Sequence, residues 1–291
     1  MRLERAFLRD SMILVTVAAV VAVALGRRRE SRATERDVGR LFAAARERPA
    51  RDRTGDTVAD LPAPVRRYFD TVFEDGPPPG GAVRVEQEGT LRLGGPDSPW
   101  EPFTATHHAT TRCPGFVWDA TVGVLPGVSV RVRDSFVGGA GAARVTLFGA
   151  LPVAGAASSP ELNEAELQRY LAEAVWYPTT LLPGNGVTWE PVDDRTARAT
   201  LACGETTASL DFHFSSADGE GLEVERVHTD RRYRRVDGEF EPTPWTGLWR
   251  DYEVVAGVRV PTEGEVVWHR PEGELHAWRG RVKGIERQPL P

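Results

Sequence analysis

Hydrophobic and polar residues alternate along the chain from Ala82 onward, in short runs that glycine and proline separate. Because successive side chains of a β-strand point to opposite faces of a sheet, this alternation predicts strands. Their connections have hairpin length, which favours a mainly β (α+β) fold: a large curved antiparallel sheet or half-barrel of about 11–12 strands around one or two helices. Twelve strands are expected, at 83–94, 101–111, 115–123, 127–137, 142–149, 187–191, 196–203, 206–215, 221–234, 247–256, 258–269 and 274–285.

Two segments before the sheet follow a helical period instead. Apolar residues at 38, 41, 42 and 45 predict a short amphipathic helix. The segment LPAPVRRYFDTVF, at 61–73, predicts a second helix that packs on the body through Val65, Phe69, Val72 and Phe73. The charged stretch 47–57 between them is predicted to be a linker.

A third helix interrupts the strands. Ser159 is a suitable N-cap, and Pro160 suits the first helical turn. Arg169 and Glu173 have the spacing of an ion pair, and with Gln168 they are expected to face away from the apolar stripe. That stripe consists of Leu167, Tyr170, Leu171 and Ala174. Pro178 is expected to end the helix.

The run Met12–Leu25 carries no charge and has arginines on both sides, which predicts a transmembrane helix. At about 1.5 Å per residue this run covers only about 21 Å of a bilayer core of about 30 Å, so residues 6–26 would have to contribute. A cleaved signal peptide ending near Ala22-Val23-Ala24 and a soluble helix are the alternatives. The prediction is a single-pass protein with the bilayer as partner. The arginine count favours a cytoplasmic body, but the side stays open.

These elements suggest three parts: a membrane anchor with a basic collar at 1–36, a short helix and linker at 37–60, and a single β-rich domain at 61–291. The net charge is −6. Residues 1–36 carry +4, so the remainder carries −10. A body that acidic has no surface for phosphate backbones, which argues against nucleic-acid binding.

Motifs that would name a reaction are absent from the sequence. Gly138–Gly141 resembles a nucleotide-binding turn, but a strand pattern follows it, so we predict a hairpin turn. His107 and His108 are adjacent and point to opposite faces, while Cys113 and Cys203 lie far apart in sequence. No metal and no cofactor are predicted. Whether the two cysteines pair stays open.

Asp134 is the acid that the alternation singles out. In strand 127–137 it shares a face with Val128, Val130, Val132 and Phe136. A carboxylate on an apolar face has to be paired, hydrogen-bonded or protonated. It either reaches water or an arginine at the strand end, or marks a ligand cavity. Asp119, by the same reasoning, lies opposite Phe116 and Trp118 and could be a plain surface residue.

Several aromatic residues lie near turns or strand ends beside prolines. Large rings with one polar edge suit the wall of a ligand cavity, although each ring taken alone could serve packing only. The predicted ligand-binding residues are Trp118, Asp134, Trp176, Tyr177, Trp245 and Trp249.

Six phrases carry a family resemblance: LPAPVRRYF, PGFVWDA, LQRYLAEAVWYPTTLLPG, GVTWEPVDD, PWTGLWRDY and GVRVPTEGEVVW. Together, from 61 to 285, they resemble an uncharacterised prokaryotic domain-of-unknown-function family that often follows one membrane helix. The resemblance implies no activity and no site residue. The order of helices and strands is also similar to the half-barrel of periplasmic lipoprotein carriers, although no lipobox cysteine follows the apolar run.

The leading hypothesis is a membrane-anchored β-rich module that binds a lipid or another apolar ligand in a concave, aromatic-lined cavity. One alternative is a hydrolase using Asp119 or Asp134 with Arg169, Glu173 or a histidine. A second alternative is a structural or interaction domain at the membrane.

Overall fold

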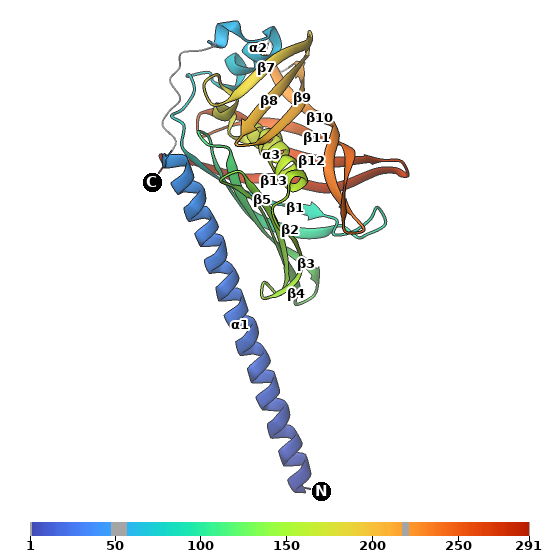
Figure 1. The fold of residues 1–291 in the computed structure, drawn as a ribbon. Helices are drawn as coiled ribbons and strands as arrows, with labels where there is room; N and C mark the ends of the chain where they lie inside the picture. Colours follow the sequence, from blue (N-terminus) through green and yellow to red (C-terminus); the bar gives the residue numbers. More distant parts are fainter. Residues whose placement is uncertain (1, 48–56, 217–220, 291) are drawn as a thin grey trace.

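A computed structural model describes residues 2–47, 57–216 and 221–290, with the backbone alone for residues 2–17 and 19. It confirms a mainly β fold, with one antiparallel sheet of thirteen strands that curls around a helix (Figure 1). The strands are β1 (Ala82–Leu91), β2 (Glu101–Thr110), β3 (Gly115–Leu125), β4 (Val128–Val137), β5 (Ala140–Leu147), β6 (Leu151–Ala156), β7 (Val187–Asp193), β8 (Thr196–Cys203), β9 (Thr206–Ser216), β10 (Leu222–Val236), β11 (Glu239–Val255), β12 (Val258–Arg270) and β13 (Gly273–Gln288).

Every predicted strand segment overlaps an observed strand. The strand that the sequence pattern missed is β6, whose residues Leu151–Ala156 are almost all exposed and do not alternate. The predicted hairpin turn at Gly138–Gly141 is confirmed, because Gly138 and Gly139 join β4 to β5 with positive φ angles of 63° and 88°.

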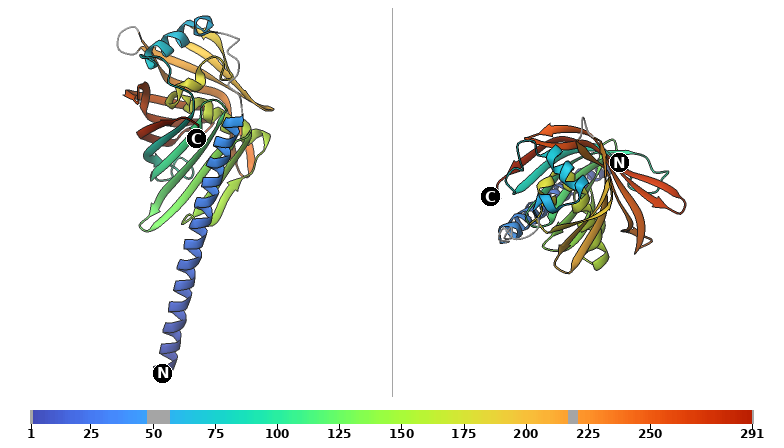
Figure 2. Two further views of the ribbon diagram at one scale, coloured as in Figure 1. Left: turned by 90° about the vertical axis from the view of Figure 1, so that its left-hand side faces the viewer. Right: turned by 90° about the horizontal axis from the view of Figure 1, so that it is seen from above.

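The sheet consists of two meanders joined by the pairing of β1 with β13, and its two edges are β6 and β7. Helix α3 (Pro160–Glu173) links these edge strands in sequence. It contacts β3, β4 and β5 on one arm of the sheet and β8 to β11 on the other, so it lies inside the curl (Figure 2). The predicted N-cap is confirmed, since the Ser159 hydroxyl accepts a hydrogen bond from the Leu162 N–H at 3.2 Å.

The concave face of the sheet is mostly filled by α3 and by aromatic rings. The short 3₁₀ turns Ala174–Trp176 and Pro178–Leu181 continue the chain after α3. The fully buried rings include Phe116, Tyr170, Trp176 and Tyr177. Gln168, which is expected to face away from the apolar stripe, is nevertheless buried, with only 2 % exposure. The curled sheet covers more of the helix than its apolar stripe, so the polar residues Glu166 and Gln168 are buried as well.

Helix α2 (Ala63–Val72) packs against β8, β10 and β12. Its predicted apolar face is confirmed, since Val65, Phe69, Val72 and Phe73 are all buried. A short 3₁₀ turn, Val58–Asp60, precedes it. The predicted linker 47–57 lies almost entirely outside the described residues.

Helix α1 (Arg2–Glu47) is one continuous helix whose second half packs on β2, β3 and β4, while its first half extends away from the body (Figure 1). The short helix predicted around Val38 is part of it, and Leu41 and Ala45 are buried. Among the residues described, no helix is both long and apolar enough to cross a bilayer. The predicted membrane helix is therefore not supported, although residues 12–17 and 19 of its apolar run lie outside the described side chains. A location at the membrane stays a prediction.

Candidate functional site

A cavity of about 280 Å³ remains between α3 and the concave face of the sheet. The cavity reaches the surface beside Leu93, which follows β1 and is an exposed residue of the lining. Four tryptophans and five charged residues share the wall with small and aliphatic side chains. The lining consists of Leu91, Arg92, Leu93, Trp118, Val132, Asp134, Arg169, Glu173, Arg232, Trp245, Trp249, Val266, Ala277 and Trp278.

Glycines on the neighbouring strands make room for the rings of this wall. A Cβ at Gly264 would come within 2.7 Å of the Trp249 ring, and one at Gly280 would come within 2.1 Å of the Trp278 ring. Trp249 and Gly264 are direct partners of the β11–β12 ladder, and Gly264 is in turn the partner of Gly280. These glycines therefore let the indole rings lie close to the sheet and leave space above them.

One side of the cavity carries a charged group of residues from β4 and α3. Arg169 Nη1 donates to Asp134 Oδ2 at 2.7 Å, and Arg169 Nε donates to Glu173 Oε1 at 2.9 Å. The guanidinium carbon of Arg169 also lies 4.8 Å from the centre of the Trp118 ring. The predicted ion-pair spacing on α3 is confirmed, and Asp134 is paired with an arginine as its apolar face requires.

Arg232, from β10, lies on another side of the cavity and is only 9 % exposed. Its guanidinium carbon is 4.7 Å from the centre of the Trp245 ring and 5.3 Å from that of Trp268. Its Nε and Nη2 both donate to the Ala165 carbonyl oxygen, at 3.3 Å. Burial lowers the pKa of Arg232 to about 10, because the charged form is poorly solvated.

Two more titratable groups lie buried behind this wall. Burial, and secondly the charge of Asp134, raise the pKa of Glu166 to about 8. Burial, and secondly the charge of Arg169, lower the pKa of His107 well below its ordinary range. The His107 ring stacks between Phe116 and Tyr177, and its Nδ1 lies 3.6 Å from Glu173 Oε2. Burial therefore favours the neutral form of both side chains.

Of the six residues predicted to bind a ligand, the structure brings Trp118, Asp134, Trp245 and Trp249 together around the cavity. Trp176 packs edge-on behind Trp249, with ring centres 5.0 Å apart, and does not line the cavity. Tyr177 lies further inside and donates from its hydroxyl to the Tyr170 carbonyl oxygen. Whether these residues bind a ligand stays a prediction.

Sequence reasoning missed Arg92, Arg232 and Trp278 as parts of this wall. Trp278 is opposite Val266 in the β12–β13 ladder, so alternation in β13 could have placed it on the inner face. Arg232 could not be found in this way. The pairing of β10 with β9 and with β11 shifts register at positions before Arg232, so alternation along the strand no longer tells which face Arg232 occupies.

Asp119, the acid of the hydrolase alternative, lies on the opposite face of the sheet from Asp134. It accepts hydrogen bonds from Arg131 of β4, with Nε at 2.7 Å, and from the Thr34 hydroxyl of α1 at 2.9 Å. It can therefore not act together with Arg169 or Glu173. Within the described residues, no group of three His, Cys, Asp or Glu side chains could hold a metal ion.

A larger hollow of about 670 Å³ lies on this outer face, between α1, β1 to β4 and the turn after β5, with Thr34, Asp119 and Arg131 in its lining. Its polar groups already pair with each other: Arg84 pairs with Glu86, and Arg131 pairs with Asp119. The inner cavity differs, because several of its polar groups have no partner in the part of the chain that the structure describes. We therefore take the inner cavity as the candidate site.

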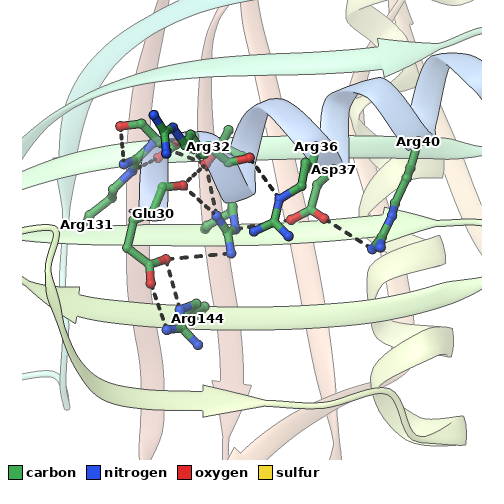
Figure 3. Close-up of polar contacts among 11 residues, drawn as sticks. Glu30, Arg32, Arg36, Asp37, Arg40, Arg131 and Arg144 are labelled. Atoms are coloured by element: carbon green, nitrogen blue, oxygen red, sulfur yellow. Dashed lines mark hydrogen bonds and ion pairs between the residues drawn. The ribbon is translucent and has the colours of Figure 1, made fainter. Parts of the chain in front are cut away.

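A cluster of ion pairs fastens α1 to this outer face (Figure 3). Glu30, which is 5 % exposed, accepts two hydrogen bonds from Arg144, at 3.0 and 2.8 Å. Arg133 lies 3.8 Å from Glu30 and 3.6 Å from Asp37. Gly26 also packs against Ala150, where a Cβ would come within 2.6 Å of the alanine side chain. The helix thus has one defined position on the sheet.

No curated protein matches the chain. One solved structure with a similar fold is that of a LolA superfamily protein from Nitrosomonas europaea, at 10 % sequence identity and a TM-score of 0.37. The match covers 81 % of this chain and 96 % of that one, but a likeness this distant says nothing about what this chain binds. The family profile described as "Family of unknown function (DUF6920)" matches residues 59–286, and the chain belongs to that family.

Proposed function

We propose that the β-rich body binds a small apolar or amphiphilic molecule in the cavity between α3 and β11 to β13. The observation that carries this proposal is the cavity itself. The remainder of the concave face is packed with buried rings, yet a space walled by Trp118, Trp245, Trp249 and Trp278 stays open. Because residues 264 and 280 are glycines, the rings of Trp249 and Trp278 can lie close to the sheet and leave this space open.

The dimensions of the cavity limit the ligand. Its volume of about 280 Å³ lies near the lower end of ligand pockets, which hold about 300–1,000 Å³. A small molecule fits inside, or one end of a longer molecule whose other end leaves past Leu93. The rings supply a large apolar contact area, and the charged residues supply a few polar contacts that orient the ligand.

A titration of the full chain with the fluorescent apolar probe 1-aminoanthracene tests this proposal. We expect saturable one-to-one binding. Val266 lines the cavity, so Val266→Trp should fill it and weaken binding about tenfold or more. Val254 is 62 % exposed on the neighbouring strand, so Val254→Trp is the matched control and should bind as the wild type does. Equal binding by both variants, or no saturable binding by the wild type, would refute the proposal.

A further inference from the structure

Arg169, which is partly buried, and Arg232, which is buried, both line the cavity, but only Arg169 has carboxylate partners. Arg169 is held by both Asp134 and Glu173. Arg232 donates only to the Ala165 carbonyl oxygen, and no carboxylate among the described residues lies within ion-pair distance of it. A buried positive charge without a partner is costly, and such groups gather at functional sites.

The charged residues that line the cavity also have an excess of positive charge. Arg92, Arg169 and Arg232 oppose only Asp134 and Glu173, which leaves one positive charge in excess. Glu166, a further acid behind the wall, does not line the cavity and forms no ion pair with Arg232 within the described part of the chain, and burial raises its pKa, which favours its neutral form. The cavity therefore lacks one negative charge.

Several hydrogen-bond donors of the cavity lining have no acceptor among the described residues. The indole N–H groups of Trp245 and Trp249 are buried and have no acceptor among the described residues, although both rings line the cavity. The Nη1 group of Arg232 also has no acceptor among the described residues. Native proteins rarely leave several such donors unpaired, and a ligand oxygen is a common way to satisfy them.

We infer that the ligand is an amphiphile with a single anionic head, of which a carboxylate is the simplest, and that this head binds Arg232. This inference rests on the proposed function. The head accepts hydrogen bonds from the Arg232 guanidinium, and the indole N–H groups of Trp245 and Trp249, which have no acceptor among the described residues, are further donors in the same wall. The apolar part extends along Leu91, Val266 and Ala277 toward Leu93.

The test is calorimetric titration of the full chain at pH 7 with three probes: decanoate, decanol and acetate. Decanoate has the charged head and the tail, decanol has only the tail, and acetate has only the head. We expect decanoate to bind about tenfold or more tightly than decanol, and acetate to bind far more weakly than either. This comparison needs no variant, so it does not depend on how a substitution folds.

The variants locate the head. Arg232→Met removes the charge and fills similar space, and it should abolish the preference for decanoate over decanol. Arg226 is exposed on the same strand, so Arg226→Met is the matched control and should keep the preference. The near-UV circular dichroism spectrum reports whether each variant keeps its packed rings.

The outcomes separate the two proposals. Equal affinity of the wild type for decanoate and decanol would overturn the anionic head and leave the apolar site standing. Binding of acetate as tight as that of decanoate would show an anion site without an apolar part, which also overturns the inference. A preference for decanoate that survives in Arg232→Met would place the head elsewhere. Failure of decanoate, decanol and 1-aminoanthracene to bind would refute the proposed function itself.

Discussion

The Trp249 ring lies across Gly264 of the neighbouring strand, so closely that a Cβ at Gly264 would come within 2.7 Å of it. Gly264→Ala therefore has to push this rigid ring toward the cavity. We expect a loss of about 1–3 kcal/mol in the free energy of unfolding, as for other overpacked cores. A changed near-UV circular dichroism spectrum, together with denaturant unfolding, measures the effect.

Gly284 provides the control for this substitution. It lies in β13, and a Cβ there would have no neighbour within 4 Å. Gly284→Ala should change stability by no more than about 0.5 kcal/mol. If the two alanine variants were equally stable, the close packing of Trp249 on Gly264 would not hold in solution.

Glu166 gives the protein a specific pH dependence. Its pKa is raised from 4.5 to about 8 in the folded state. Its contribution to stability is therefore fully present below pH 4.5 and is lost as the pH rises through about 8. Glutamine has the shape of the protonated acid but does not titrate, so Glu166→Gln should keep this contribution to stability as the pH rises.

The difference in unfolding free energy between Glu166→Gln and the wild type should thus grow between about pH 5 and 9, by at most about 1.4 kcal/mol per pH unit. Denaturant unfolding at several pH values measures it. The lowered pKa of His107 affects stability only at pH values below the ordinary pKa of a histidine. Its effect is the same in both proteins, so it cancels in the difference between their unfolding free energies. Parallel stability curves across this range would contradict the burial of Glu166 as an acid.

Glu30 holds α1 on the outer face of the sheet through Arg144. Glu30→Ala should weaken this docking by about 1.5–3 kcal/mol, since hydrogen bonds between charged groups are the stronger kind. Hydrogen exchange of the amides in residues 27–45 should then become faster. Glu35 is exposed on the same helix, so Glu35→Ala should leave the exchange rates unchanged. Equal exchange in both variants would mean that other contacts hold the helix.

Ser159 caps the helix that crosses the inside of the sheet. Ser159→Ala should lower the free energy of unfolding by about 1 kcal/mol, because the Leu162 N–H loses its acceptor. Ser159→Asp keeps an acceptor there and should restore most of the loss in thermal unfolding. A full loss in both variants would show that the cap itself contributes little.

The inner face of β3 and β4 could be predicted because their pairing is regular there. Trp118 is directly opposite Asp134, and Phe116 is opposite Phe136, so simple alternation places all four side chains on one face. The N-cap at Ser159 was equally accessible, since it depends on residues next to each other in sequence.

Arg232 and the filled interior could not be predicted for physical reasons. Irregular pairing between Val224 and Arg226 and between Thr229 and Arg232 resets which face each residue of β10 occupies. Whether a ring lines a cavity or fills it depends on the packing of distant strands. Trp176 and Trp249 look alike in sequence, yet only Trp249 lines the open space.

Quenching of tryptophan fluorescence by 10-bromodecanoate shows whether a ligand enters the cavity, since bromine quenches only rings that it contacts. Four of the eight tryptophans line the cavity. We expect saturable one-to-one quenching in the wild type and in Val254→Trp, and its loss in Val266→Trp. Quenching that rises without saturation, or that is the same in all three proteins, would show that no ligand enters between α3 and the sheet.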